Sequence, residues 1–265
     1  MNALLPTRMV EKPWGREALP APFAAPKGQR IGEVWFEPPP ELPQLLVKYI
    51  FTSEKLSVQV HPSDAQLPGH GKEECWLVLA AEPGAALGVG FREPPGREAM
   101  RQAALDGSIE AMLAWYPVKA GDYFYIPAGT VHAIGAGVSL IEVQQTSDVT
   151  YRLYDYGRPR ELHLDEGLAV ALGTQHPPEH RKHVADGSST ALVGGPPFRL
   201  ERIVGQPAPE LADRFGANPL LVIPISSPVI IGSDTVPPGS CGLAPSLAAT
   251  RFATDGICLI AQPCM

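Results

Sequence analysis

Four side chains of types that bind divalent metals stand at short, ordered spacings in the first half of the chain. Gln59 and His61 lie two residues apart in LSVQVHP, Glu74 follows in GKEECW, and His132 stands in GDYFYIPAGTVHAI. Because alternate residues of a strand share a face, we expect Gln59 and His61 on the same side of a sheet. The set predicts a divalent metal held between strands.

The chemistry expected of that site is Lewis-acid chemistry. Two neutral imidazoles, one amide and one carboxylate would leave a bound dication with a net charge of about +1, which stabilises negative charge on substrate oxygens. Nitrogen and oxygen donors without a thiolate fit Zn²⁺ best, and Fe²⁺, Mn²⁺ and Co²⁺ are the alternatives. We therefore expect one divalent ion, with zinc as the first choice.

Short β-strands must position these ligands. The 30 prolines and 26 glycines divide the chain into short segments, many of them rich in β-branched or aromatic residues. The segments read as strands are GEVWF, LLVKYIFT, LSVQVH, CWLVLAA, DYFYIP, VSLIEVQ and TYRLY. This pattern predicts a mostly β protein that closes as a barrel or sandwich.

Two stretches are expected to be helical and to pack outside the barrel. In residues 96–116, Gly107 ends a first piece and Ser108 is a candidate N-cap for IEAMLAWY. In residues 161–172, Leu164, Leu168 and Ala171 share one helical stripe.

A polar segment, residues 173–195, predicts a connection between two units. Its histidines, His176, His180 and His183, stand among proline, lysine and arginine, so we expect them in a solvated loop and not at a metal. Short strands resume from residue 196 to 265 without any histidine. The second unit therefore cannot repeat the metal site.

The overall composition excludes several classes of partner. The chain has 265 residues, 45% hydrophobic and 18% charged, and a formal net charge of −7, without a basic patch for nucleic acid or an anionic membrane. No segment approaches the roughly 18 apolar residues of a membrane span, and the first residues lack the apolar run of a signal peptide. We expect a cytoplasmic protein that acts on a small molecule, with no protein partner. The cysteines form no C-x-x-C pair and are expected as free thiols; they are Cys75, Cys241, Cys258 and Cys264.

The residues that frame His132 indicate a fold family. GDYFYIPAGTVH matches the second motif of the cupin barrels, G-x5-P-x-G-x2-H, at Gly121, Pro127, Gly129 and His132. The motifs LSVQVHP, GKEECW, IPAGTVHAI and EVQQTSDVTYRLYDYGR, in that order, resemble type I mannose-6-phosphate isomerase. EKPWG, IGEVWF and RELHLDEGLAVAL extend the resemblance over residues 10 to 172.

The first cupin motif departs from its usual form. Gln59 replaces the first histidine of His-x-His, and Glu74 comes thirteen residues after His61. The resemblance explains the departure, because it implies a metal site made of glutamine, histidine, glutamate and histidine at these positions. The bifunctional type of this isomerase has an HxH cupin motif behind a nucleotidyltransferase domain, and both are absent from this sequence.

The resemblance implies a domain plan and an activity. The plan is a cupin (jelly-roll) barrel at residues 1–172 with a helical insert around 96–116, a linker at 173–195 and a shortened cupin-like β unit at 196–265. The implied activity interconverts mannose 6-phosphate and fructose 6-phosphate through a cis-enediol, with a zinc cofactor and a sugar phosphate as substrate. Another metal cupin enzyme, such as a dioxygenase, and a sugar-binding cupin without turnover remain as alternatives.

Such a reaction needs a proton carrier and an anchor for phosphate. Lys72, two residues before Glu74, is expected in the same cavity, and Glu142 in LIEVQQ is a candidate acid or base. Arg152 in TYRLYDYGR stands at the position of the family's active-site arginine, and a guanidinium suits a phosphate or an enediolate. The alternative for Arg152 is a structural ion pair with Asp148 or Asp155.

Two further residues are candidates for substrate contact. Ser57 is expected on the same strand face as Gln59, and Trp76 on the same face as Glu74. The alternatives are a serine bonded to the backbone and a tryptophan of the core. Cys75 is expected on the opposite face as a small buried hydrophobe.

Overall fold

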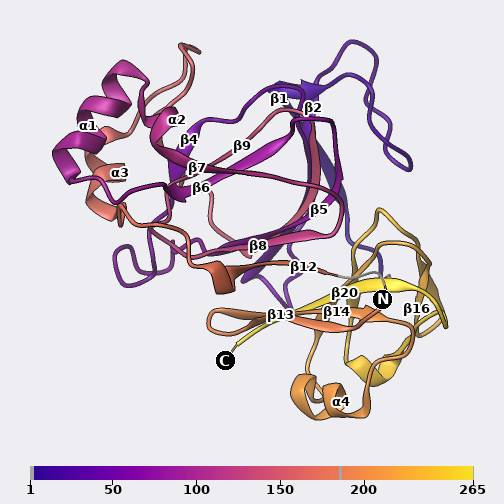
Figure 1. The fold of residues 1–265 in the computed structure, drawn as a ribbon. Coiled ribbons are helices and arrows are strands. Elements are labelled where there is room, and N and C mark those ends of the chain that lie inside the picture. Colours follow the sequence, from indigo (N-terminus) through magenta and orange to yellow (C-terminus); the bar gives the residue numbers. More distant parts are fainter. Residues whose placement is uncertain (1–2, 185–186, 265) are drawn as a thin grey trace.

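The computed structural model describes residues 3–184 and 187–264, which form two β units (Figure 1). The first unit is a barrel with helices α1, α2 and α3 on its outside, and the second, smaller unit packs beneath it. Most of the regular structure is strand, so the predicted mostly β class is confirmed. Within the described residues, no helix has the length and apolar character needed to cross a bilayer.

The barrel is made of two antiparallel sheets that face each other. The seven-stranded sheet has the order β1 (Thr7–Arg16), β2 (Ile31–Phe36), β3 (Leu45–Phe51), β10 (Val138–Gln145), β5 (Glu74–Ala81), β8 (Asp122–Ile126) and β12 (Arg181–His183). The five-stranded sheet has the order β11 (Tyr151–Tyr154), β4 (Val58–Val60), β9 (His132–Ile134), β6 (Ala86–Phe91) and β7 (Leu113–Pro117). Apolar side chains of both sheets, such as Ile50, Trp76, Leu87 and Ile134, fill the space between them.

The helical insert lies where the sequence predicts it, but it is shorter. Helix α1 (Arg97–Asp106) ends at Gly107, whose φ of 83° is left-handed, and Ser108 precedes α2 (Ile109–Met112). The expectation that the helix continues to residue 116 is wrong, because β7 begins at Leu113 and pairs with β6. Hydrogen bonding to a neighbouring strand overrides the helical pattern there.

Helix α3 (Leu164–Val170) forms within the segment predicted for it. Leu164, Leu168 and Ala171 all pack into the apolar cluster that α1 and α3 form with β4, β9 and β11, as the stripe predicts. Figure 1 shows these helices outside the five-stranded sheet, so they support the strands that carry two of the predicted metal ligands.

The predicted linker contains regular structure. A short 3₁₀ helix, η1 (Pro178–His180), leads into β12, which pairs with β8 at the edge of the seven-stranded sheet. Strand β13 (Thr190–Gly194) then opens the second unit by pairing with β14 (Phe198–Val204). The connection between the units is therefore anchored to a sheet at each end.

The second unit is again built from two sheets. The five-stranded sheet has the order β13, β14, β20 (Ile257–Pro263), β15 (Leu220–Pro224) and β18 (Gly242–Ala244), and the three-stranded sheet has the order β17 (Asp234–Val236), β16 (Val229–Ile231) and β19 (Thr250–Arg251). Helix α4 (Pro209–Phe215) and the 3₁₀ helix η2 (Leu247–Ala249) complete the unit. Its interior is apolar, with Phe215, Val222 and Ile260 among the buried residues.

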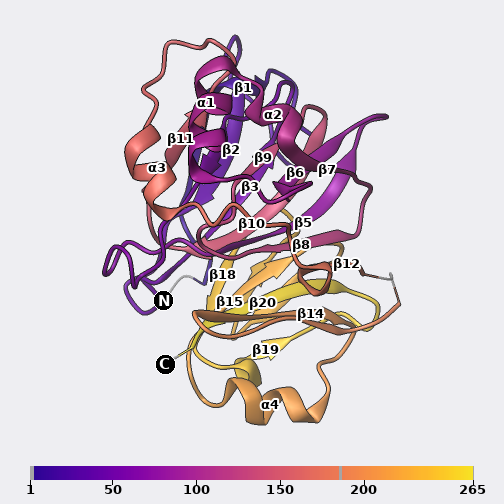
Figure 2. The same cartoon turned by 60° about the vertical axis from the view of Figure 1, so that its left-hand side comes forward.

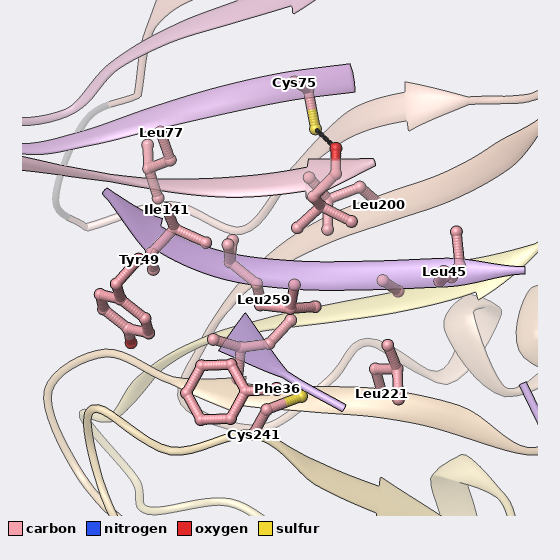
Figure 3. Close-up of a cluster of buried hydrophobic side chains, with 14 of the residues drawn as sticks. Phe36, Leu45, Tyr49, Cys75, Leu77, Ile141, Leu200, Leu221, Cys241 and Leu259 are labelled. Carbon is pink, nitrogen blue, oxygen red and sulfur yellow. Dashed lines mark hydrogen bonds between the residues drawn. The ribbon is translucent and has the colours of Figure 1, made fainter. Parts of the chain in front are cut away.

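The two units share a large apolar interface. The five-stranded sheet of the second unit lies against the outer face of the seven-stranded sheet of the barrel (Figure 2). Figure 3 shows the side chains between them, with Phe36, Tyr49 and Ile141 from the barrel and Leu221 and Leu259 from the second unit. All four cysteines are free thiols, and Cys75 belongs to this interface cluster, on the face predicted for it.

Successive side chains of β3, β5 and β10 lie on opposite faces of the seven-stranded sheet. Odd-numbered residues, such as Tyr49, Cys75 and Ile141, pack toward the second unit. The even-numbered Lys48 and Glu142 instead line a cavity inside the barrel. The sheet that receives the second unit therefore carries the polar site on its other face.

Candidate metal centre and substrate cavity

Three of the four predicted metal ligands converge inside the barrel. Glu74 Oε2 lies 3.5 Å from His61 Nε2, and Glu74 Oε1 lies 3.3 Å from His132 Nε2. One donor atom from each residue lies within 4.8 Å of the others, and all three residues are buried. Within the described residues, this is the one cluster of histidine, cysteine and acidic side chains that could hold a metal.

Backbone carbonyls fix the orientation of both imidazoles. His61 Nδ1 lies 2.9 Å from Val149 O, and His132 Nδ1 lies 2.9 Å from Thr130 O. A carbonyl oxygen accepts only, so each Nδ1 carries the proton and each Nε2 presents a lone pair toward Glu74. Histidine ligands of metals are commonly oriented in this way.

The two histidines are neutral and the glutamate is ionised, which is the charge state that metal ligands require. Burial lowers the pKa of His61, and the charge of Lys72 lowers it further. Burial also lowers the pKa of His132. Burial alone would raise the pKa of Glu74, but the positive charge and hydrogen bond of Lys72, together with the charges of His132 and Lys48, outweigh it, and the pKa lies below its ordinary value. Two neutral imidazoles and one carboxylate result.

Lys72 lies within the cluster, as predicted. Its Nζ is 2.5 Å from Glu74 Oε2 and 3.0 Å from His61 Nε2, so its ammonium group occupies the place of a cation between the two donors. Glu74 Oε1 is buried and has no hydrogen-bond partner in the described part of the chain. A carboxylate oxygen left unpaired inside a protein is costly, and a cation at this point would satisfy it. The donor set therefore fits a divalent metal.

The fourth predicted ligand, Gln59, reaches the cluster through its amide group. Gln59 pairs with His132 across β4 and β9, and its Nε2 lies 3.3 Å from His132 Nε2. Its Oε1 accepts a hydrogen bond from Ser57 Oγ at 3.1 Å. A half-turn of the terminal amide would present the oxygen to the cluster, because the amide carries an acceptor and a donor at equivalent positions.

A turn with a left-handed glycine delivers His132. The chain leaves β8 at Ile126, bends through Pro127 and Gly129, and enters β9 at His132. Gly129 has a φ of 82°, and a Cβ at this position would lie 2.7 Å from Leu172 Cγ. Gly129 N also donates to His61 O, so this turn ties together the backbones of two predicted ligands.

A cavity of about 250 Å³ opens beside the cluster. Its lining includes most of the predicted site residues, namely Ser57, Gln59, Lys72, Glu142 and Arg152. It also includes Lys12, Glu33, Trp35, Lys48 and Arg160, which the sequence did not single out.

Glu142 is held by two donors on opposite sides. Lys48 Nζ donates to Glu142 Oε1 at 2.9 Å, and Trp76 Nε1 donates to Glu142 Oε2 at 3.0 Å. Trp76 is completely buried, and its ring packs edge-on against His132. These contacts favour the alternative of a core tryptophan, which orients Glu142.

Lys48 is one of the cavity residues that the sequence reasoning missed. Its Nζ also donates to Gln144 Oε1 at 2.5 Å and lies 4.7 Å from the centre of the Trp35 ring. Burial alone would lower the pKa of Lys48, but the carboxylates of Glu142 and Glu33 outweigh it and raise the pKa. A lysine in the middle of the wholly buried strand LLVKYIF was the available signal.

Arg152 lines the cavity without an ion pair. Its Nε is buried and has no hydrogen-bond partner among the described residues. Burial lowers its pKa, and the like charge of Arg160 lowers it further. The alternative of a structural pair is not realised, because Asp155 instead pairs with Arg158 and Arg160.

The expectation of solvated histidines in the linker is wrong for His176. His176 is only 3% exposed, stacks on Phe124 and places Nε2 2.7 Å from Tyr125 O. The chain packs this segment against β8 through η1, so a polar sequence becomes part of the barrel wall. His183 is exposed and pairs with Asp122, as a surface residue would.

Comparison with known proteins confirms the resemblance to mannose-6-phosphate isomerases. No family model matches the chain. The chain is 44% identical over 136 residues to a mannose-6-phosphate isomerase of Streptococcus mutans, an alignment that covers 48% of this chain and 43% of that protein. It is 38% identical over 163 residues to mannose-6-phosphate isomerase ManA of Bacillus subtilis, with 56% of this chain and 51% of that protein covered. The matched regions span about half the length of these relatives.

Solved structures confirm the predicted cupin fold. A mannose 6-phosphate isomerase from Bacillus subtilis superimposes with a TM-score of 0.75 at 22% identity, over 98% of this chain and 99% of that chain. A mutant of phosphomannose isomerase from Salmonella typhimurium superimposes with a TM-score of 0.74 at 13% identity, over 99% of this chain and 100% of that chain. The second β unit is included in both matches, since they cover nearly the whole chain.

Proposed function

We propose that this chain is a metal-dependent isomerase that interconverts mannose 6-phosphate and fructose 6-phosphate. The observation that carries the proposal is the buried cluster of His61, Glu74 and His132 beside a cavity lined by Lys72, Glu142 and Arg152. The similarity to proteins named mannose-6-phosphate isomerase supports this substrate over others. The cytoplasmic location expected from the sequence is part of the same proposal.

His61, Glu74 and His132, joined by Gln59, would hold the metal, and the absence of a thiolate favours Zn²⁺. When bound, a divalent ion supplies stabilisation for the negative charge that develops on neighbouring substrate oxygens. The protein's own contribution is to keep both imidazoles neutral and oriented. Their Nδ1 protons are engaged by Val149 O and Thr130 O, so both Nε2 lone pairs remain available.

Proton transfer between C1 and C2 of the sugar requires an acid or base in the cavity. Lys72 and Glu142 both line it, and both side chains are nearly buried, so each is held at a fixed place in the cavity. Glu142 is positioned by Lys48 and Trp76, and Lys72 by His61 and Glu74. We infer that one of these two groups carries the proton.

Arg152 is the group we assign to the anionic part of the substrate. Its guanidinium lines the cavity and has an unpaired, buried Nε, so an incoming phosphate or enediolate oxygen would complete its hydrogen bonding. Ser57 contributes at the same wall, where its hydroxyl already holds the amide of Gln59.

A coupled assay on mannose 6-phosphate tests the proposal. The metal-free protein should be inactive and should regain turnover with Zn²⁺ alone, which a redox-active dioxygenase would not do. Glu74→Gln should lose bound zinc and turnover together, because it removes the one carboxylate ligand. His183→Gln, at an exposed histidine, is the matched control and should retain both. No isomerisation by zinc-loaded protein, with sugar phosphate still bound, would instead indicate a sugar-binding cupin.

A further inference from the structure

We propose that Arg160 is a second anion ligand of the cavity and that Asp155 is the positioning residue that directs it there. The proposal rests on the proposed function in one respect: the anion is the phosphate group of the sugar phosphate. Arg160 is the first residue of RELHLDEGLAVAL and lies after β11, and the resemblance of that motif assigned it no role in the site.

The contact between Asp155 and Arg160 is a two-point clamp. Arg160 Nε donates to Asp155 Oδ2 at 2.6 Å, and Arg160 Nη2 donates to Asp155 Oδ1 at 2.6 Å. Asp155 is 2% exposed, so the carboxylate is fixed inside the protein. A guanidinium held along one edge in this way keeps further N–H groups on its other edge. Since Arg160 lines the cavity, those donors are available to a ligand there.

The other arginine at Asp155 has a different role. Arg158 Nη1 donates to Asp155 Oδ1 at 3.1 Å, while its Nη2 donates to Glu54 Oε2 at 3.1 Å and to Lys55 O at 2.8 Å. These bonds direct Arg158 toward the β3–β4 connection, and Arg158 is absent from the cavity lining. The carboxylate thus connects a structural arginine with one that faces the cavity.

The pairing of charges leaves only one end of the cavity attractive to an anion. Lys12 pairs with Glu33, Lys48 with Glu142, and Lys72 with Glu74. Arg152 has no ion pair in the described part of the chain. Arg160 is paired with Asp155, but that one carboxylate also pairs with Arg158. The remaining carboxylate of the lining is Asp148. An anion that bridges Arg152 and Arg160 would relieve the repulsion between these two like charges.

The turn that carries the clamp adopts a costly backbone conformation. Tyr156, next to Asp155, has a φ of 55° and is the one non-glycine residue with positive φ in the described chain. Its ring packs beneath the guanidinium of Arg158, 5.5 Å away. Backbone strain of this kind persists where surrounding contacts enforce it, and the ion pairs of Asp155 provide that enforcement here.

Direct binding of inorganic phosphate, measured by titration calorimetry on the zinc-loaded protein, tests the proposal without requiring turnover. Arg160→Gln should bind phosphate about 10- to 100-fold more weakly, because it loses a charge-assisted contact. In the isomerase assay its KM for fructose 6-phosphate should rise by a similar factor while kcat changes by less than about threefold. Arg160→Lys should fall between the wild type and Arg160→Gln, since it keeps the charge but not the fork.

Asp155→Asn should shift phosphate affinity and KM in the same direction by a smaller factor, because Arg160 keeps one neutral acceptor. Two control variants should keep the phosphate affinity within about twofold of the wild type. Arg158→Gln alters the ion pairs of Asp155 on the side away from the cavity, and Arg101→Gln removes a positive charge elsewhere on the surface. If Asp155→Asn fails to fold, the two Arg160 variants decide, since the Arg160 side chain is 26% exposed and is easier to replace than the buried Asp155.

The failures of the two proposals are distinguishable. A wild-type protein that binds phosphate through Arg160 but does not isomerise sugar phosphates supports this inference and overturns the proposed function. An active isomerase whose phosphate affinity and KM are unchanged in Arg160→Gln overturns this inference. Equal losses in Arg160→Gln and Arg101→Gln would also overturn it, because the effect would then come from net charge alone.

Discussion

Breaking the buried pair of Lys48 and Glu142 should destabilise the protein strongly. The side chains are 8% and 5% exposed, and Lys48 Nζ lies 2.9 Å from Glu142 Oε1. Lys48→Met removes the cation and leaves an uncompensated carboxylate in the barrel. Glu142→Gln removes the anion. Lys48 and Trp76 donate to different carboxylate oxygens, and the amide keeps an acceptor at only one of those two positions.

The expected magnitude follows from two opposing contributions. At an effective dielectric constant of about 20, unit charges 2.9 Å apart attract by about 6 kcal/mol. Desolvation of both ions offsets most of that attraction, so the intact pair contributes little net stability. Removal of one partner leaves the desolvation cost of the other, and each single variant should therefore lose about 3–5 kcal/mol.

Urea unfolding of the metal-free protein at neutral pH is the appropriate assay, because bound metal would add its own stabilisation. The double variant, Lys48→Met with Glu142→Gln, should be less destabilised than the sum of the singles by about 2 kcal/mol. The exposed pair of Arg101 and Asp165 provides the control cycle, with an expected coupling below about 1 kcal/mol. Strictly additive losses at Lys48 and Glu142 would refute the reasoning.

Three further outcomes are expected. Burial lowers the pKa of His176 to about 4 in the folded protein. The same histidine has a pKa of about 6.5 in the unfolded chain, so the unfolded state binds the proton more readily. The free energy of unfolding should therefore be highest above about pH 6.5 and should fall by up to about 3 kcal/mol as the pH is lowered toward 4. His176→Asn should flatten this slope in urea unfolding at pH 4.5 and 7.5, and an unchanged slope would contradict the assignment. Leu259→Ala, in the interface cluster, should cost about 3 kcal/mol while calorimetry still shows one transition; two separate transitions would mean that the units unfold independently. Gly129→Ala should lower zinc affinity in equilibrium dialysis, because a side chain at a φ of 82° strains the turn before His132; unchanged affinity would exclude that role.

The sequence was sufficient to locate the candidate metal cluster because its predicted ligands stand in short motifs with strong local geometry. Gln59 and His61 are positioned by strand alternation, and Gly129 marks the turn before His132. The mostly β class followed from the same local signals. These features depend on neighbouring residues, which a sequence displays directly.

The remaining site residues depend on contacts between distant segments. Lys48 meets Glu142 because β3 pairs with β10, and Arg160 enters the cavity because Asp155 holds it. His176 was expected in solvent, but η1 packs it against β8, and no local pattern reveals that contact. Strand pairing and the burial of a loop are decided by the whole chain, so spacing alone could not predict them.

The placement of the candidate metal site and the second unit on opposite faces of one sheet restricts changes in chain length. In β3, β5 and β10, neighbouring residues alternate between the cavity and the interface with the second unit. Deletion of a single residue within a strand would therefore place the cavity-facing residues in the interface and the interface residues in the cavity. Charged groups such as Lys48 would then face the second unit, and apolar groups such as Tyr49 would enter the cavity. Insertions and deletions that preserve both the site and the interface must therefore fall in the connections between strands.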